Sequence, residues 1–299
     1  MNLPRYRILI DRLSSKLMYL LSVSTAFVLA LMAFGLYFKS RAVLAVDSLG
    51  DLLFSSSWKP LKGDFGFFPY IIGSVYVTFV AIAIALPLCL LTSIYLSEYA
   101  HKRMRDWIQP LIDLLAGIPS VVYGIWGVIF VVPIIKNHIA PLFGVTTTGY
   151  SVLAGGIVLA IMIFPLIISV SLEVFASVPR EVREASLSLG ATKWQTVKYA
   201  VIRKASPGIA AAVLLGLSRA FGETMAVLMV AGNVAQIPRT IFDPAYPLAA
   251  LIANNYGEML SVPLYDSALM FASLVLLVVV LFFNVGARLV LVRLTRTTR

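Results

Sequence analysis

Six apolar runs set the limits on what this chain can fold into. A helix of roughly 20 residues is long enough to cross the hydrocarbon core of a membrane. The runs cover residues 17–38, 70–97, 108–135, 150–175, 208–232 and 266–287. Because lipid offers no hydrogen bonds to exposed backbone groups, segments that cross it must be helical or closed barrels. The sequence therefore predicts an all-α membrane protein with six transmembrane helices.

The composition excludes an ordinary soluble domain. Of the 299 residues, 13% are charged and 60% are hydrophobic, whereas soluble domains carry roughly a quarter of charged residues. The net charge of +10 does not indicate nucleic-acid binding, because the basic residues are scattered between the apolar runs. The single cysteine, Cys89, lies inside an apolar run, and His101 and His138 lie in different loops. We therefore expect no disulfide, no metal site and no cofactor.

The basic residues predict the orientation of the spans. Seventeen of the 24 lysines and arginines lie near the two termini or in the loops at 98–107 and 176–207. Cytoplasmic loops carry such an excess, so both termini are expected to be cytoplasmic. A cleaved signal peptide is the alternative for the first run. However, the uncharged stretch from Leu17 to Phe38 is longer than the apolar region of a typical signal peptide. Residues 5–16 mix apolar side chains with four cations, which predicts a short helix at the membrane surface.

The outer loops show the residue types of ordered segments. Trp58, Pro60 and Gly63 punctuate residues 39–69 with turn signals. A second outer loop contains the apolar stretch from Leu248 to Ala253, followed by Asn, Asn, Tyr and Gly. We expect a short outer helix there.

The loop between the fourth and fifth runs predicts two short helices joined by a tight turn. Ser177 is suited to cap a first helix that accepts Pro179 in its first turn. Gly190 suits the left-handed residue at the end of that helix. Thr192 and Gln195 form the capping-box pattern of a second helix. A plain connecting hairpin is one interpretation, and a DNA-binding helix-turn-helix is another, although the adjoining membrane segments argue against it.

A short motif in this loop points to a class of protein. Glu184-Ala185-Ser186, then three intervening residues and Gly190, resembles the EAA loop of bacterial ATP-binding-cassette (ABC) importer permeases. The resemblance implies a coupling helix that docks into a groove of an ATPase subunit. Family members usually continue with Leu-Pro about a dozen residues after the glycine, whereas this chain has Ile202-Arg203 there.

Two opposite charges lie near the middle of the fifth run. In a continuous helix, Arg219 and Glu223 would be one turn apart on the same face. A charge inside a membrane costs on the order of 2.5–3.5 kcal/mol on insertion scales, and an ion pair would reduce this penalty. The pair is either a packing contact or part of a transport pathway. An arginine fork matches two phosphate oxygens, so we expect Arg219 to contact an anion and Glu223 to be its resting partner.

The third run contains Gly117-Ile118-Pro119-Ser120, and Tyr123 follows. Pro119 frees a backbone carbonyl, and Ser120 and Tyr123 fall near one helix face. This pattern predicts a kinked helix that lines a cavity. Plain packing through small residues remains the alternative.

Two longer motifs make the resemblance more specific. The segment from Ser218 to Val227 is similar to the signature of phosphate-specific permeases, and the segment from Ala116 to Gly124 resembles their third-span motif. The order Gly-Glu-Thr-Met-Ala-Val is closer to PstC-type than to PstA-type subunits. The resemblance implies a type I (MetI-like) ABC permease fold. Residues 1–69 would hold the surface segment, the first span and the first periplasmic loop, and residues 70–299 the permease core with its coupling loop at 177–207.

The resemblance also implies partners and a mechanism. These are a PstA-type second permease subunit, an ATPase dimer and an external phosphate-binding protein, acting by alternating access in the cytoplasmic membrane. The chain has no Gly-rich phosphate-binding loop, so another chain is expected to hydrolyse the ATP. Transport of another oxyanion, such as molybdate or sulfate, is the alternative within the class. An ion-gradient carrier or channel working alone is the alternative outside it, but it would leave the EAA-like loop without a purpose.

Overall fold

The computed structural model describes residues 3–258, 262 and 264–297. Six helical stretches are long and apolar enough to cross a membrane. They are Ile10–Val46, Phe68–Tyr99, Ser120–Leu142, Val152–Ser177, Lys193–Gly222 and Tyr265–Leu289. The predicted all-α architecture with six spans is confirmed, although the limits of several spans differ from the sequence prediction.

The first half of the chain forms three spans and, between α1 and α3, the outer cap of residues 47–67. Its elements are α1 (Leu3–Val46), α2 (Leu49–Phe54), β1 (Trp58–Lys59), the 3-10 turn η1 (Pro60–Lys62), β2 (Asp64–Phe65), α3 (Phe68–Ile94), the π-helical turn η2 (Tyr95–Tyr99), α4 (Lys102–Ala116), α5 (Ser120–Trp126), the π-helical turn η3 (Gly127–Val131), α6 (Val132–Ile134), the π-helical turn η4 (Ile135–Ile139) and α7 (Ala140–Leu142). The two strands pair antiparallel, with Trp58 opposite Phe65.

The second half of the chain forms the other three spans and the loops between them. Its elements are α8 (Val152–Ser177), α9 (Arg180–Ser188), α10 (Lys193–Gln195), the π-helical turn η5 (Thr196–Val201), α11 (Ile202–Gly222), α12 (Met225–Val230), α13 (Leu248–Asn255) and α14 (Tyr265–Thr297).

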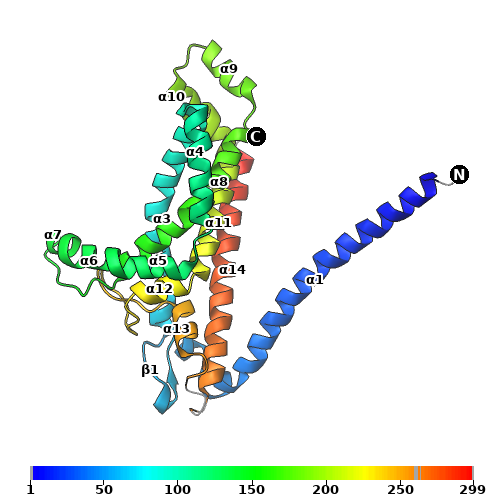
Figure 1. The fold of residues 1–299 in the computed structure, drawn as a ribbon. Helices are drawn as coiled ribbons and strands as arrows, with labels where there is room; N and C mark the ends of the chain where they lie inside the picture. The colour runs from blue at the N-terminus through cyan, green and yellow to red at the C-terminus, as the bar shows by residue number, and fades with distance from the viewer. Residues whose placement is uncertain (1–2, 259–261, 263, 298–299) are drawn as a thin grey trace.

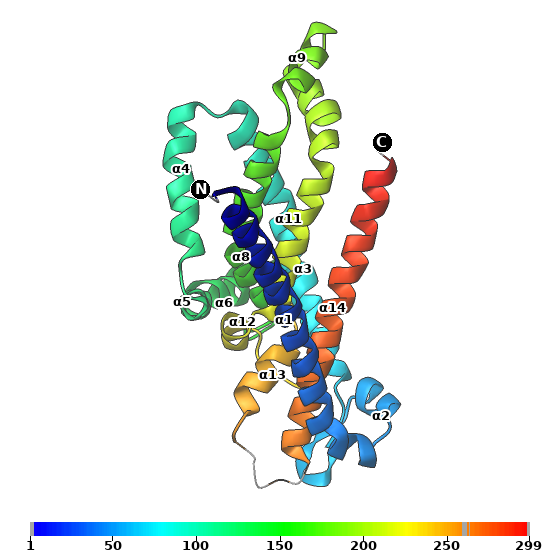
Figure 2. The same ribbon diagram turned by 90° about the vertical axis from the view of Figure 1, so that its right-hand side faces the viewer.

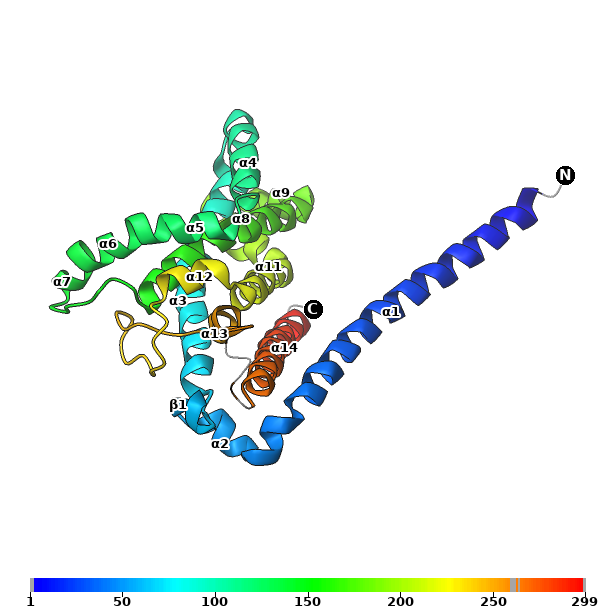
Figure 3. The ribbon, with the colours of Figure 1, turned by 60° about the horizontal axis from the view of Figure 1, so that its bottom comes forward.

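Helix α1 stands apart from the rest of the molecule. It diverges from the bundle along most of its length and meets α14 near its C-terminal end (Figures 1 and 3). There the Ser267 hydroxyl accepts from the amide of Val43 and donates to the carbonyl of Lys39. The helix predicted for residues 5–16 is not a separate element, because α1 continues through this segment without a break; its place at the membrane surface stays a prediction. No glycine or proline interrupts the chain between Pro4 and Gly35, so nothing local ends the helix.

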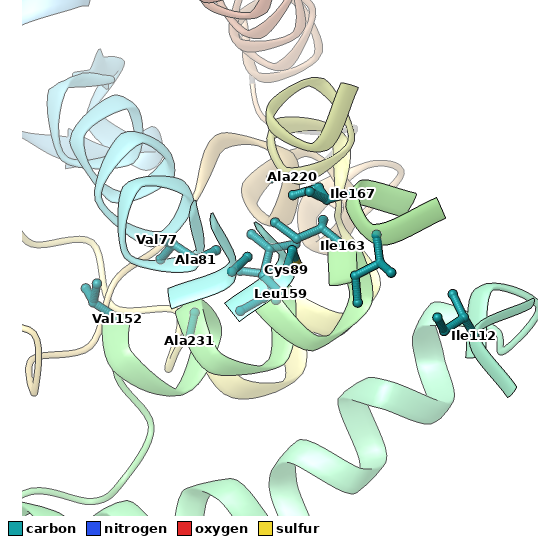
Figure 4. Close-up of a cluster of buried hydrophobic side chains, with 14 of the residues drawn as sticks. Val77, Ala81, Cys89, Ile112, Val152, Leu159, Ile163, Ile167, Ala220 and Ala231 are labelled. Atoms are coloured by element: carbon teal, nitrogen blue, oxygen red, sulfur yellow. The ribbon is translucent and has the colours of Figure 1, made fainter. Parts of the chain in front are cut away.

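Helices α3, α8 and α11 form the centre of the bundle (Figures 1 and 2). Buried side chains from α3 and α8 pack between them, among them Val77, Ala81, Leu159 and Ile163 (Figure 4). The backbones approach closely at Gly156, where a Cβ would lie 2.4 Å from Val80 Cγ1. Small residues at helix contacts are typical of packing in membranes, where close van der Waals contact replaces the hydrophobic effect.

The third span is broken into two parts. Helix α4 lies alongside α8 and ends at Ala116, and α5 to α7 then turn away sideways (Figures 1 and 3). The predicted span at 108–135 is therefore wrong in its limits, since the apolar helix runs over Ser120–Leu142. The kink predicted at Pro119 is a complete break. Pro119 is extended and stands at the N-cap of α5, with φ −59° and ψ 142°, and proline fits there because it has no amide to leave unpaired.

The fifth span is also broken and begins earlier than predicted. Helix α10, η5 and α11 are continuous from Lys193 to Gly222. The second short helix predicted at Thr192 is therefore the start of the span itself. The helix ends at Gly222, Glu223 is extended with φ −74° and ψ 127°, and α12 restarts at Met225. The predicted continuous span over 208–232 is wrong for this reason.

The described residues of the outer loops form turns and short elements, as the turn signals predicted. The Trp58 ring lies 5.2 Å from the Tyr70 ring and 5.5 Å from the Phe67 ring, measured between centroids. These aromatic contacts join the β1–β2 hairpin to the start of α3. The predicted outer helix at 248–253 is confirmed as α13, whose first amide, on Leu248, donates to the Ser74 hydroxyl of α3.

Candidate substrate and coupling sites

The α9 hairpin forms the tip of the molecule at the end opposite β1 (Figure 1). Gly190 has φ +84°, and the capping box of Thr192 and Gln195 is present, so both local predictions are confirmed. The predicted cap at Ser177 is wrong. Ser177 closes α8 and donates to the Val174 carbonyl, while Pro179 holds the N-cap position of α9.

The residues of the EAA-like motif lie on α9. Glu184 and Ala185 are exposed, whereas Ser186 is half-buried with its hydroxyl 3.0 Å from that of Thr196. Three large apolar side chains next to the motif are also exposed: Leu187 at 49%, Leu189 at 89% and Trp194 at 51%. Exposed apolar groups that lie together are a feature of surfaces that bind other proteins.

Arg219 lies in the last turn of α11 and is exposed. The predicted ion pair with Glu223 is wrong for this structure. Within the described part of the chain, the salt bridge is between Arg183 and Glu98. Glu223 lies after the end of α11, and its Oε1 accepts from the amide of Ala226 at 3.2 Å. The carboxylate therefore caps the start of α12, where a negative group is favoured.

The two helix breaks lie side by side. An added Cβ at Gly124 of α5 would meet Ala226 of α12 at 3.2 Å, and one at Gly127 would meet Val230 at 2.8 Å. The two helices therefore run alongside each other in the same direction. The break before Ser120 and the break at Glu223 consequently lie at the same end of the pair.

Tyr123 connects the third span across its break. Its hydroxyl donates to the Leu115 carbonyl of α4 at 2.8 Å. Ser120 opens α5 and is half-buried. The structure thus brings Arg219, Glu223, Ser120 and Tyr123, all singled out by the sequence, to one region.

Glu223 also faces the bundle interior. It lines a small cavity together with Ser74 and Thr78 of α3 and Leu159 of α8. Leu159 is seven residues from the start of α8 at Val152, which corresponds to about 10 Å along the helix. The break therefore lies within the depth that α8 spans. The described residues contain no group of three His, Cys, Asp or Glu side chains that could hold a metal ion.

Two polar contacts near these sites escaped the sequence analysis. The hydroxyl of Ser218, next to Arg219, donates to Asn284 Oδ1 on α14. Asn284 is a single amide side chain inside an apolar run, and a polar side chain in such a place indicates a buried polar contact or a functional site. The contact between Glu98 and Arg183 joins residues 85 positions apart, and no local pattern in the sequence indicates it.

Six spans, two helix breaks that lie side by side and an exposed hairpin at one end together fit a multi-pass membrane transport subunit. Residues 89–299 match the family described as binding-protein-dependent transport system inner membrane component. The chain belongs to this family. It is therefore a multi-pass inner-membrane permease subunit of an ABC transporter, which works with other components of such a transporter and leaves ATP hydrolysis to a separate subunit.

Named relatives extend over most of the chain. It is 35% identical over 294 residues to the phosphate transport system permease protein PstC of Xylella fastidiosa, covering 93% of this chain and 90% of that protein. It is 41% identical over 235 residues to the probable ABC transporter permease protein YqgH of Bacillus subtilis, covering 78% and 74%. A probable PstC protein of Methanocaldococcus jannaschii is 34% identical, covering 90% of each chain. The predicted resemblance to PstC-type permeases is confirmed.

Solved structures share the fold. A bacterial alginate ABC transporter, in complex with an alginate pentasaccharide-bound periplasmic protein, contains a chain that matches with a TM-score of 0.62 and 16% identity, covering 92% of this chain and 95% of that one. The inward-facing MetNI methionine ABC transporter matches with a TM-score of 0.54 and 18% identity, covering 77% and 94%. The predicted ABC importer permease fold is confirmed.

Proposed function

We propose that this chain carries inorganic phosphate across the cytoplasmic membrane, with Arg219 as the main anion contact. The observation that carries the proposal is the place of Arg219. It is exposed at the end of α11, next to two helix breaks, and among the described residues no carboxylate pairs with it. A charged side chain within a span is expected to face a water-filled cavity or a partner rather than lipid.

The chemistry of the region supports an anionic substrate. A guanidinium offers two parallel donors that match two phosphate oxygens. Discontinuous helices whose broken ends meet inside the membrane are typical of transporter binding sites. Glu223 does not compete for Arg219, because its carboxylate caps α12. Several relatives bear names that specify phosphate transport, and this supports phosphate over other oxyanions.

The partners follow from the same proposal. A PstA-type permease subunit would cover the exposed face of Arg219 and complete the pathway. An ATPase dimer would dock on the tip formed by Glu184, Ala185, Leu187 and Leu189, and an external phosphate-binding protein would deliver the anion to the outer cap. Alternating access would then carry phosphate past Arg219 to the cytoplasmic side.

Uptake by the complete transporter in proteoliposomes tests the substrate. Labelled phosphate is supplied with its binding protein, with ATP inside the vesicles, and arsenate, sulfate or molybdate is added in excess. We expect ATP-dependent uptake that arsenate reduces and that sulfate and molybdate leave unchanged. A reduction of phosphate uptake by sulfate or molybdate equal to the reduction by arsenate would contradict the phosphate assignment. Uptake driven by an ion gradient without ATP would contradict the transporter class.

A further inference from the structure

A partly buried ion pair joins the α9 hairpin to η2, the turn that continues α3. Arg183 Nη2 lies 2.6 Å from Glu98 Oε1, and Arg183 Nε donates to Glu98 Oε2 at 3.2 Å. The arginine side chain is 22% exposed and the glutamate side chain 9%. A two-pronged contact with this burial fixes both side chains in one geometry. Exposed ion pairs are weak, but this one is largely shielded from water.

The same guanidinium also holds the end of α8. Its Nη1 donates to the Val178 carbonyl at 2.7 Å, and its Nη2 donates to the Phe175 carbonyl at 3.0 Å. These carbonyls belong to the last turn of α8 and the residue after it, where acceptors lack helical partners. Arg183 therefore caps α8 with a positive charge, which the helix C-terminus favours. One side chain of α9 thus binds both α3 and α8.

A second contact holds the other leg of the hairpin. Lys193, the first residue of α10, places its Nζ 4.6 Å from the centroid of the Tyr99 ring. Tyr99 directly follows Glu98 in η2. Two consecutive residues at the end of α3 therefore hold the two legs. Beneath them lies a buried apolar cluster to which α3, α8 and η5 all contribute: Ile94, Phe175, Val178, Val197, Val201 and Ala205.

We propose that Arg183 and Glu98 form a rigid joint that transmits movement of α9 to α3 and α8 together. This rests on the proposed function, in which an ATPase subunit contacts α9. Along the backbone, α9 follows α8 through the extended residues Val178 and Pro179, with ψ 123° and 144°. Such a link lets α9 pivot while α8 stays in place. Arg183 is accordingly a positioning residue, since it contacts neither the substrate nor ATP.

The far ends of the two helices meet the candidate substrate region. Ser74 and Thr78 of α3 and Leu159 of α8 line the cavity that also contains Glu223. Helices α3 and α8 pack against each other along their length. A displacement applied at Glu98 and Arg183 is therefore passed on to the walls around the helix breaks.

Paired measurements of transport and ATP hydrolysis test the joint. In the reconstituted complete transporter, R183A and E98Q are expected to keep the ATPase subunit bound and hydrolysing ATP. The amount of phosphate taken up per ATP hydrolysed should fall on the order of tenfold, within the usual range of coupling between sites. R183K keeps the charge but loses the planar fork, so its ratio should lie between that of R183A and that of the wild type. The matched control is K204A, which removes an exposed cation from the start of α11 and should keep the wild-type ratio.

The outcomes separate the joint from other roles. Wild-type uptake per ATP in both R183A and E98Q overturns the proposal. If R183A loses the ATPase subunit, E98Q decides, because it leaves the bonds from Arg183 to the carbonyls in place. Loss of the ATPase subunit from E98Q also overturns the proposal, since the pair would then serve assembly. Failure of the proposed function is distinguishable from failure of the joint, because the wild-type transporter itself would then show no ATP-dependent phosphate uptake.

Discussion

Replacing Gly156 by alanine is expected to force α3 and α8 apart. The new Cβ would lie 2.4 Å from Val80 Cγ1, 2.9 Å from Val80 Cβ and 3.4 Å from the amide nitrogen of Ala81. Rotation of the Val80 side chain moves Cγ1 away, but it leaves Cβ in place. The helix backbones must therefore separate. Overpacking of this kind typically costs about 1–3 kcal/mol of unfolding free energy.

The expected loss is measured by denaturant unfolding of the purified complex. Gly286→Ala is the matched control, because a Cβ there meets nothing within 4 Å in the same kind of apolar helix. That change should be neutral or stabilising by up to about 1 kcal/mol, since alanine favours helix over glycine. Gly156→Ala combined with Val80→Ala should recover part of the loss, because only the Cγ1 clash is removed. We expect a coupling free energy of about 0.5–3 kcal/mol between the two positions. Strictly additive effects, or equal stability of the Gly156 and Gly286 variants, would refute the reasoning.

Three further predictions concern the tip, the outer loop and the topology. Gly190→Asp places a side chain on a residue with φ +84°, and Glu184→Lys reverses a charge on the exposed face of α9. Both should reduce co-purification of the ATPase without affecting membrane insertion, and normal transport in both would count against the coupling assignment. Burial opposes ionisation of Asp243, but the backbone amides of Thr240 and Arg239 donate to its carboxylate and lower its pKa. The ionised Asp243 carboxylate thus stabilises the fold fully above its ordinary pKa of about 3.9. This stabilisation is lost as the pH falls through the lower pKa that the carboxyl group has in the folded protein. Asp243→Ala should cost about 1–2 kcal/mol at neutral pH and remove that acid-sensitive part, as pH-dependent unfolding would show; an unchanged acid dependence would exclude Asp243 as its source. Residue 190 is expected to be cytoplasmic. In a Cys89→Ser background, a cysteine at this position should therefore react with an impermeant reagent only after the cells are permeabilised. Labelling in intact cells would show that the predicted orientation is wrong.

Local chemistry was the part of the fold that the sequence predicted well. Gly190 and the Thr192 capping box depend on neighbouring residues alone, and both appear in the structure. The six spans follow from length and apolarity, which a membrane requires of any crossing segment. The breaks were harder to predict. Hydropathy averages over a whole span, so it joined residues 208–232 across the extended Glu223.

The remaining misses depend on tertiary contacts. The expected pairing of Arg219 with Glu223 assumed an unbroken helix, but the helix ends at Gly222 and the amide of Ala226 in α12 donates to the Glu223 carboxylate. A glycine followed by Glu-Thr is a local sign of a helix end and a new cap, so this break could have been recognised. The joint between Glu98 and Arg183 could not, because it depends on how α3 and α9 meet. Ser120, Tyr123, Arg219 and Glu223 were singled out from the sequence, and the structure brings them to one region; their role in the pathway stays a prediction.

Arg219 gives the last prediction, and the most direct test of the substrate site. Arg219→Ala and Arg219→Gln remove the two-pronged donor from the end of α11. Losing one partner of a desolvated, hydrogen-bonded charge pair costs about 2–5 kcal/mol, which corresponds to roughly 30-fold or more in affinity. We expect phosphate uptake close to background in both variants. Insertion and assembly should remain normal, because Glu223 caps α12 without help from Arg219.

Arg219→Lys distinguishes an anion contact from a charge that serves packing. Lysine keeps the positive charge but presents it as a point, without the planar fork that bonds two oxygens. If Arg219 binds phosphate, uptake by the lysine variant should stay about tenfold or more below the wild type, which equals about 1.4 kcal/mol. The matched control is Arg239→Lys, which makes the same change at an exposed residue of an outer loop and should leave uptake unchanged. Near wild-type uptake by Arg219→Ala, expressed at normal level with its partners, would show that the anion follows another path.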